Sequence, residues 1–274
     1  MDVISLFDGI SVAMVALQKA NIPIRSYTAY EIDKYAIQVS KKNHSIITHK
    51  GDVKELKTVV PCDILIGGSP CTDLSIAGKK DGLEGERSKL FWEYVRIKNL
   101  LKPKWFILEN VASMRDKDKA IITEAMGVEP IMIDAGLVSA QRRKRYFWTN
   151  IPTVLPEDRG IVVGHILQPE VDEKYYVKRT EEELAEKKKS QGYRVYPIEG
   201  KSVSLVANGG GVGAKTGLYK VGDRIRRLTP VECERLQGLP DEYTSGISDT
   251  QRYKCCGNAF NSDVIVHIIK GIKN

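Results

Sequence analysis

"DVISLFDG", residues 2–9, decides the fold, because a short apolar run in it ends in an acid and a glycine. Three further runs, "RSYTAYE" (25–31), "DILIGG" (63–68) and "WFILE" (105–109), also end in an acid or in glycine. Such short apolar runs are typical of parallel strands whose two faces are both covered. We therefore expect these runs to be strands of one sheet, each ending beside a residue suited to bind a ligand.

Helical patterns lie between these strands. Residues 11–20 and 33–42 have the spacing of helices. A third helix is indicated by one apolar face, which comprises Leu90, Tyr94, Ile97 and Leu101. "RRKRYFWT" (142–149) predicts one more strand. The alternation favours an α/β fold with a doubly wound sheet, in which ligands bind at the carboxyl ends of the strands.

The pattern changes in the second half of the chain. Residues 178–190 are highly charged and read as a solvated helix face, and strand and glycine segments follow them. The final apolar run, 263–272, suits a return to the main sheet or to its helical layer. We expect a catalytic and cofactor-binding domain of residues 1–172 and 252–274, and a smaller domain of residues 173–251.

The composition restricts the class of protein. The chain has 274 residues, a net charge of +7 and a pI of about 9.0, which favours polyanionic partners, although many basic proteins bind no nucleic acid. Five cysteines without a C-x-x-C pair argue against a disulfide framework or a metal site. No apolar run is as long as a membrane span, and the first residues lack the basic region of a signal peptide, so we expect a cytoplasmic protein.

Three strand ends carry residues that suit an adenosine-containing cofactor. Gly9 stands where a strand turns into a helix, so a ligand can approach the backbone closely there. Glu31 ends the second strand, where an acid binds ribose hydroxyls. Asp52 ends the third and can accept from an adenine amino group. The chain has no G-x-G-x-x-G, so acids that only cap loops remain an alternative.

Cys71 is a candidate nucleophile. Glycine and proline in "GGSPC" shape a rigid turn after a buried strand, and the polar, glycine-rich segment 72–87 suits a loop that closes over a substrate. A thiolate needs a nearby positive charge, a helix N-terminus or a base. No histidine lies near in sequence, which argues against a Cys–His hydrolase and keeps an inert cysteine as the alternative.

Further polar residues are expected near that edge. Glu109 ends a strand and can donate or accept a proton, unless it only caps a loop. In "QRRKRYFW", Gln141, Arg143 and Arg145 share one face of the strand. That face would bind phosphates or a carbonyl oxygen, or would be a solvated edge.

"NGGGVGAKTG" (208–217) resembles a phosphate loop only superficially. Ala214 stands where G-x-x-x-x-G-K-[ST] requires glycine, and no clear helix follows, so a nucleoside triphosphate site is rejected. A loop that presents its backbone to DNA phosphate is favoured instead.

These segments, in this order, resemble the DNA cytosine-5 methyltransferase family over nearly the whole chain. "LFDG" is similar to the family's cofactor loop, "GGSPC" to its nucleophile motif, "ENV" to its glutamate motif and "QRRKR" to its Q-x-R-x-R motif. Glu31 and Asp52 match the next two cofactor motifs. Two later segments match the edge of the recognition domain and the closing motif: "RRLTPVECERLQGLPDEYT" (226–244) and "QRYKCCGNAFNSDVI" (251–265).

The resemblance implies a Rossmann-like, doubly wound mixed sheet, the S-adenosylmethionine-dependent methyltransferase fold, with a small and mostly β target-recognition domain. It implies that Cys71 attacks C6 of a cytosine flipped out of duplex DNA, after which C5 takes a methyl group from S-adenosylmethionine. Glu109 would steady the ring at N3, Arg145 would hold O2, and Arg143 would position Cys71 or a phosphate.

The resemblance also assigns binding residues. The expected contacts of S-adenosylmethionine, whose product is S-adenosylhomocysteine, are Phe7, Asp8, Gly9, Ile10, Ser11, Val12, Glu31, Ile32, Asp52, Val53, Gly68, Pro70, Leu90, Asn258, Ala259 and Phe260. The expected DNA contacts are Ser75, Gln141, Gly209, Gly210, Gly211 and Lys215. Ser11 departs from the family, which often has a second glycine there. The short segment before "RRLTP" implies a compact recognition domain and a short target.

Two alternatives stay open. One is a transfer-RNA methyltransferase of the same fold, although that branch usually carries C-F-T after P-P-C and this chain has "SPCTDLS". The other is an inactive DNA-binding relative. The favoured partner is double-stranded DNA, for a monomer in the cytoplasm of a bacterium or a phage-infected cell, associated with the nucleoid. Whether a cognate restriction endonuclease accompanies it stays open.

Overall fold

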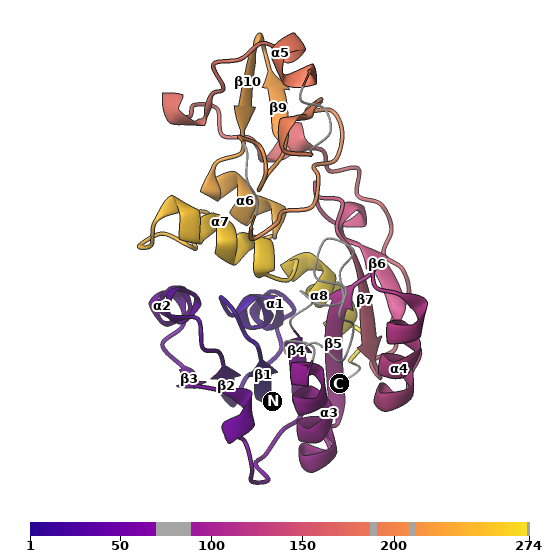
Figure 1. Cartoon of the computed structure of the whole chain (residues 1–274). Helices are drawn as coiled ribbons and strands as arrows, with labels where there is room; N and C mark the ends of the chain where they lie inside the picture. The colour runs from indigo at the N-terminus through magenta and orange to yellow at the C-terminus, as the bar shows by residue number, and fades with distance from the viewer. Residues whose placement is uncertain (70–88, 187–190, 209–211, 273–274) are drawn as a thin grey trace. The chain divides into compact units, whose positions relative to one another are not determined.

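A computed structural model of the chain describes residues 1–69, 89–186, 191–208 and 212–272 (Figure 1). Within these residues, seven strands form one sheet in the order β3-β2-β1-β4-β5-β7-β6. The strands are β1 (Asp2–Leu6), β2 (Ser26–Tyr30), β3 (Ile47–Lys50), β4 (Ile64–Gly68), β5 (Trp105–Val111), β6 (Ile131–Asp134) and β7 (Lys144–Thr149).

The sheet is mixed. Parallel pairing links β3, β2, β1, β4 and β5, whereas β7 pairs antiparallel with β5. The central parallel strands β1, β4 and β5 are short and largely buried, as their apolar runs predict, whereas the edge strand β3 has exposed residues. The predicted fold class, a doubly wound mixed sheet, is confirmed.

The helices of the described chain follow the expected order. They are α1 (Val12–Lys19), α2 (Lys34–Asn43), α3 (Lys89–Leu101), α4 (Asp116–Met126), α5 (Glu181–Ala185), α6 (Pro230–Leu236), α7 (Asp249–Asn258) and α8 (Ser262–Ile269). Figure 1 shows α3 beside β4 and β5, and the Tyr94 hydroxyl of α3 hydrogen-bonds the carbonyls of Leu65 and Ile107, 3.3 and 2.9 Å away. This contact ties α3 to the middle of β4 and β5. Tyr94, Phe91 and Ile97 of α3 also belong to the apolar core that covers these strands.

The chain divides into two compact units. Unit 1 comprises residues 1–133, 144–155 and 265–274, and unit 2 comprises residues 134–143 and 156–264. The expected recognition domain at 173–251 stays a prediction.

Unit 1 is completed by the C-terminal end of the chain. The His267 ring of α8 hydrogen-bonds the Val154 carbonyl at 2.7 Å. A Cβ on Gly271 would lie 2.1 Å from the Pro152 carbonyl oxygen, so only glycine fits there. The expectation that 263–272 returns to the main sheet or its helical layer is therefore confirmed in its helical form.

Unit 2 contains a three-stranded sheet, ordered β10-β9-β8, and its own apolar core. The strands are β8 (Val195–Tyr196), β9 (Leu218–Val221) and β10 (Arg224–Arg227). A buried ion pair joins β10 to α6. Arg226 Nη2 and Nη1 donate to the two oxygens of Glu232 at 2.7 and 2.8 Å, and both side chains are at most 1% exposed.

Two sequence expectations need correction. The strand expected at 142–149 begins at Lys144, because the Arg143 N–H donates to the Asp134 carboxylate at 2.8 Å instead of to a neighbouring strand. The helix expected at 178–190 starts only at Glu181, after a capping box between Thr180 and Glu183, and residues 187–190 lie outside the described residues. No helix in the described ranges is long and apolar enough to cross a membrane.

Candidate active site and nucleic-acid interface

Predicted cofactor residues gather at the carboxyl ends of the parallel strands of unit 1. Phe7 follows β1, Glu31 follows β2, Asp52 lies two residues beyond β3, and Gly68 is the last residue of β4. Parallel strands end at one edge of a sheet, so the chain brings these four positions to the same edge.

The Glu31 carboxylate is held by backbone donors. Its Oε2 accepts from the Gly9 N–H, and its Oε1 accepts from the N–H groups of Ile32 and Asp33, all at 2.8 Å. These bonds fix both oxygens and tie the loop after β1 to the end of β2. Beside this carboxylate, the apolar side chain of Ile32 is 74% exposed.

The loop after β1 has an unusual backbone. Phe7, Gly9 and Ser11 have φ angles of 55°, 59° and 61°, in the left-handed region that L side chains rarely adopt. A Cβ on Gly9 would meet nothing within 4 Å, so Gly9 is needed for its backbone angle and leaves open space on that side. Alternate left-handed residues turn the chain sharply from β1 into α1.

Several predicted cofactor residues face the interior. The side chains of Asp8, Ile10, Ser11, Val12 and Val53 are each at most 5% exposed. They can therefore meet a ligand only through their backbone.

Asp8 is a buried carboxyl group in this loop. Its Oδ1 accepts from the Tyr27 hydroxyl at 2.6 Å and its Oδ2 accepts from the Ser11 hydroxyl. Burial raises the pKa of Asp8 to about 6, although the hydrogen bonds from Ser11 and Tyr27 act in the opposite direction.

Asp52 and Leu90 take less central positions. Asp52 caps the short 3-10 helix Val53–Glu55, where its Oδ1 accepts from the Lys54 N–H at 3.0 Å, and it is half-buried. Leu90 is half-buried on α3 and packs against the core of unit 1.

Two predicted catalytic residues form an ion pair. Arg145 Nε lies 2.8 Å from Glu109 Oε1, and the two side chains are 17% and 13% exposed. Glu109 of β5 is paired with Phe147 of β7, so Arg145 is its diagonal neighbour on the same face. Because β7 is antiparallel, its first residues reach the edge at which β5 ends.

The nucleophile motif is described only up to its serine. Asn110 Nδ2 donates to the Ser69 hydroxyl at 3.1 Å, which joins the residues after β4 to β5. Ser69 is 4% exposed and Asn110 is 1% exposed, so this contact is internal. Pro70, Cys71 and Ser75 lie outside the described residues, as do Gly209, Gly210 and Gly211.

Arg143 and Gln141 belong to unit 2 and are buried. The Arg143 guanidinium donates to three backbone carbonyls, those of Leu205 at 3.2 Å, Gly257 at 3.2 Å and Ala259 at 2.9 Å. Gln141 accepts from the Leu205 N–H at 2.9 Å through Oε1 and donates through Nε2 to the Leu236 carbonyl and to Gln237. Both side chains tie together segments of unit 2 that are distant in sequence.

Asn258, Ala259 and Phe260 lie at the end of α7, also in unit 2. Asn258 is exposed and Phe260 is half-buried, whereas Ala259 is 8% exposed and its carbonyl accepts from Arg143. The side chains of Asn258 and Phe260 are thus accessible to a ligand.

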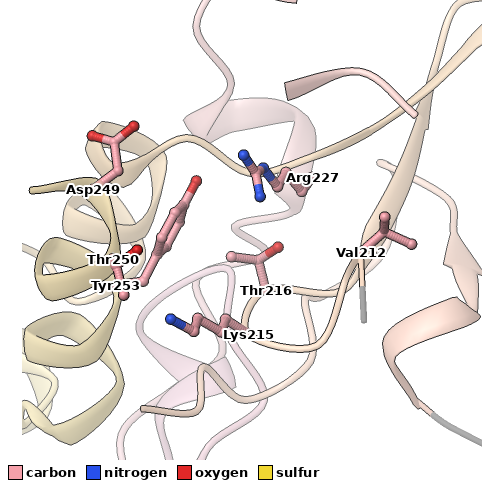
Figure 2. Close-up of a pocket in the computed structure, with 7 residues that line it drawn as sticks. All are labelled: Val212, Lys215, Thr216, Arg227, Asp249, Thr250 and Tyr253. Atoms are coloured by element: carbon pink, nitrogen blue, oxygen red, sulfur yellow. The ribbon is translucent and has the colours of Figure 1, made fainter. Parts of the chain in front are cut away.

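Lys215 lines a pocket of about 140 Å³ in unit 2 (Figure 2). The pocket is lined by Val212, Lys215, Thr216, Arg227, Asp249, Thr250 and Tyr253. In the described part of the chain, neither Lys215 nor Arg227 pairs with a carboxylate, whereas Asp249 pairs with Lys174 at 3.1 Å. The pocket therefore has excess positive charge.

The Arg227 guanidinium is held by aromatic rings. Its central carbon lies 5.5 Å from the Tyr175 ring centre and 5.9 Å from the Tyr253 ring centre. Its Nε is buried and has no hydrogen-bond partner among the described residues. A cation held in this way retains donors for an anionic ligand.

The residues at the sheet edge fit an adenosine-containing cofactor. A fixed, half-exposed carboxylate such as Glu31 suits ribose hydroxyls, and the exposed Ile32 offers an apolar contact to a base. Among the described residues, no group of three or more His, Cys, Asp or Glu side chains could hold a metal ion.

Comparison with known families decides the class. The family described as "C-5 cytosine-specific DNA methylase" matches residues 1–195 and 146–274, which together span the chain. The chain belongs to this family. The predicted enzyme class, a DNA cytosine methyltransferase, is thereby confirmed.

Individual relatives agree with this assignment. The methylase is 30% identical to the Type II methyltransferase M.HhaI of Haemophilus parahaemolyticus, over 98% of this chain and 93% of the relative. It is 29% identical to M.HpaII of Haemophilus parainfluenzae, over 93% of this chain and 84% of the relative.

Solved structures support the fold. The structure of the Entamoeba histolytica methyltransferase EhMeth has a TM-score of 0.78 at 17% identity, covering 100% of this chain and 99% of that one. The structure of S. pombe Dnmt2 methyltransferase has a TM-score of 0.73 at 18% identity, covering 98% and 97%.

Sequence reasoning missed several residues of the methylase. Tyr27 and Ser40 hydrogen-bond Asp8 and Ser11 in the loop after β1, but they lie in ordinary strand and helix patterns, which carry no local signal of this role. Arg227 was visible as a cation in "RRLTP", but only the fold brings it to the pocket with Lys215.

Proposed function

We propose that this methylase transfers a methyl group from S-adenosylmethionine to C5 of cytosine in a short, specific sequence of duplex DNA. The observation that carries the proposal is the Glu109–Arg145 ion pair, at the sheet edge where Glu31 and Gly9 also lie. This edge combines a carboxyl group and a guanidinium for a pyrimidine with a fixed carboxylate for a cofactor.

In this proposal the loop after β1 and the end of β2 hold the cofactor. Glu31 accepts hydrogen bonds from the ribose hydroxyls, and Ile32 contacts the adenine ring through its exposed side chain. Asp52 accepts from the adenine amino group, and the backbone of residues 7–12 approaches the remainder. Gly68, Pro70 and Leu90 complete the part of the binding site that lies in unit 1, and Asn258, Ala259 and Phe260 are separately proposed as cofactor contacts from unit 2. S-adenosylmethionine supplies the methyl group as a sulfonium.

The target cytosine is flipped out of the duplex, because a stacked base cannot be reached. The Cys71 thiolate adds to C6, which makes C5 nucleophilic. Glu109 holds N3 and Arg145 holds O2 as negative charge develops on the ring. After C5 has gained the methyl group, a base removes the C5 proton and the Cys71–C6 bond breaks.

Unit 2 supplies the DNA contacts in this proposal. Lys215 and Arg227 bind a backbone phosphate in the pocket of Figure 2, since both are cations without carboxylate partners in the described chain. Gly209, Gly210 and Gly211 are further proposed phosphate contacts, and Ser75 is one contributed by unit 1. Side chains within 173–251 read the base edges. Because Gln141 and Arg143 are buried, we propose that they act by holding unit 2 together.

The test compares two nucleic acids. Purified protein is incubated with labelled S-adenosylmethionine and either unmethylated genomic DNA or transfer RNA, and 5-methylcytosine is mapped by bisulfite sequencing. We expect methylation of DNA in one short context, and none for Cys71→Ser. Methylation only of RNA would assign the chain to the RNA-modifying alternative. Cofactor binding without any methylation would identify an inactive relative.

The remaining expectations concern partners. We propose that the methylase acts as a monomer in the cytoplasm, beside a restriction endonuclease that cleaves the same sequence. Sedimentation with and without duplex DNA tests the first part. Protection of methylated DNA from an endonuclease of the same host tests the second.

A further inference from the structure

Ser11 occupies a backbone conformation that glycine adopts more easily. Its φ of 61° and ψ of 40° lie in the left-handed region. Two preceding residues of the same loop, Phe7 and Gly9, also have left-handed φ angles. A non-glycine residue persists there only when its surroundings hold it. Ser11 is also fully buried, so water cannot satisfy its hydroxyl.

The Ser11 hydroxyl is held from two sides. It donates to the Asp8 carboxylate and lies 2.5 Å from the Ser40 hydroxyl of α2. Ser40 in turn lies 3.3 Å from Nε2 of His49, on β3. On the other side, Tyr27 of β2 donates to Asp8 at 2.6 Å. Asp8, Ser11, Ser40, His49 and Tyr27 therefore form one hydrogen-bonded chain, which we call the loop-anchoring chain.

The loop-anchoring chain lies within unit 1 and joins four of its parts. It connects the loop after β1 with β2, α2 and β3. Three of its members, Ser11, Ser40 and Tyr27, are at most 1% exposed, and Asp8 is 5% exposed. None of these side chains can reach a ligand, but together they set the backbone from which the Gly9 N–H contacts Glu31.

We propose that Asp8, Ser11, Ser40 and His49 are positioning residues, which hold the loop after β1 in its cofactor-binding shape, and that Asp8 makes cofactor affinity depend on pH. The inference rests on the proposed function for the identity of the cofactor. Its geometric basis is a strained loop whose hydroxyl and carboxyl groups are fully engaged by three neighbouring elements.

The charged groups around the loop-anchoring chain support the pH dependence of cofactor affinity. Burial raises the pKa of Asp8 to about 6, and the negative charge of Glu31 adds to this effect. Burial lowers the pKa of His49, and the Lys41 charge adds to it. Burial also lowers the pKa of the neighbouring His44. A loosened loop would expose Asp8 to water and return its pKa toward 3.8, so protonation of Asp8 favours the anchored loop and its ionisation as the pH rises through 6 weakens the anchor.

The first experiment measures the Kd of S-adenosylmethionine by calorimetry on the full chain. Ser11→Ala removes the hydroxyl and keeps the left-handed strain, so we expect Kd to rise roughly tenfold, as for a lost buried hydrogen bond. Ser11→Gly removes the same hydroxyl but relieves the strain, and we expect a rise of only about threefold. Ser45→Ala, an exposed serine next to His44, is the control and leaves Kd unchanged.

The second measurement is the pH profile of the same Kd. For the wild type, we expect tighter binding as the pH falls from 7 to 5, because protonated Asp8 favours the anchored loop, and for Asp8→Asn a flat profile. His49→Gln tests whether histidine causes the change, and we expect it to retain the profile. A Ser11→Ala variant that binds like the wild type, or an Asp8→Asn variant with an unchanged profile, would overturn this inference and leave the proposed function standing. A wild-type protein that binds no S-adenosylmethionine would overturn the proposed function with it.

Discussion

Two arginines separated by one residue have opposite surroundings in this methylase. Arg145, at the sheet edge of unit 1, keeps 17% of its side chain exposed and pairs with Glu109. Arg143, in unit 2, is 5% exposed and donates to backbone carbonyls. Motif spacing alone assigns both to the active site, but burial and partners separate a residue available to a substrate from one that holds the protein together.

The same contrast extends to the two units. The sheet edge of unit 1 leaves carboxylates half-exposed, as in Glu31 and Glu109. Unit 2 buries the Arg226–Glu232 pair, in which the two charges compensate each other and Glu232 also accepts from the Thr229 N–H. We therefore expect substitutions at the edge to reduce catalysis and substitutions at the buried pair to reduce stability.

The largest expected effect is at Glu109. In Glu109→Gln, we expect the methyl-transfer rate to fall roughly 100- to 10,000-fold, the range for loss of a group that exchanges a proton with the substrate. Single-turnover transfer from labelled S-adenosylmethionine measures it. Glu124→Gln, an exposed glutamate on α4, is the control. A Glu109 variant that keeps its rate but melts early would erase the distinction between the two regions.

The next effect is at the buried pair of unit 2. Glu232→Gln leaves the Arg226 charge buried without its counterion, so we expect a loss of about 3–5 kcal/mol in the free energy of unfolding. Urea denaturation measures the change. Asp241→Asn breaks the more exposed pair with Arg235 and should cost less than about 1 kcal/mol. Equal losses in the two variants would contradict the role of burial.

Asp8 is a buried carboxyl group of unit 1, and its effect on stability has a definite sign. Because its pKa is raised to about 6 from 3.8, the folded protein holds this proton more tightly than the unfolded chain. Stability from Asp8 is thus fully present below pH 4 and lost as the pH rises through 6, by about 3 kcal/mol. Urea denaturation of Asp8→Asn between pH 4 and 7 should lack this slope, and an unchanged slope would refute the assignment.

The smallest expected effect concerns DNA binding by Lys215 and Arg227 of unit 2. Unlike Arg226, these two cations have no carboxylate partner in the described part of the chain. In Lys215→Gln or Arg227→Gln, we expect the slope of log affinity for DNA against log salt to fall by about 0.9, with little dependence on sequence. Titrations of labelled duplex at several salt concentrations measure it. Lys57→Gln, an exposed lysine of unit 1, should keep the wild-type slope. A variant that changes target preference instead would show that the pocket reads bases.

The amino-acid sequence predicts the sheet and its edge well, since each apolar run and the acid or glycine after it are local signals. It predicts poorly where partners are distant. The start of β7 depends on Asp134, and the buried position of Arg143 depends on carbonyls at 205, 257 and 259. For the Arg226–Glu232 pair, the sequence contains only one local signal: "TPVE" (229–232) has the spacing of a capping box, which involves Glu232 but not Arg226.

The return of the C-terminal segment to unit 1 has a consequence for synthesis of the protein. Unit 1 includes residues 265–274, and α8 contacts the chain near Val154, so its last piece is made after all of unit 2. A ribosome adds residues one at a time, and domains generally fold as they emerge. Unit 2 can therefore fold while unit 1 still lacks a helix. Truncation of the last ten residues would leave that gap permanently open and expose the apolar surface that α8 covers.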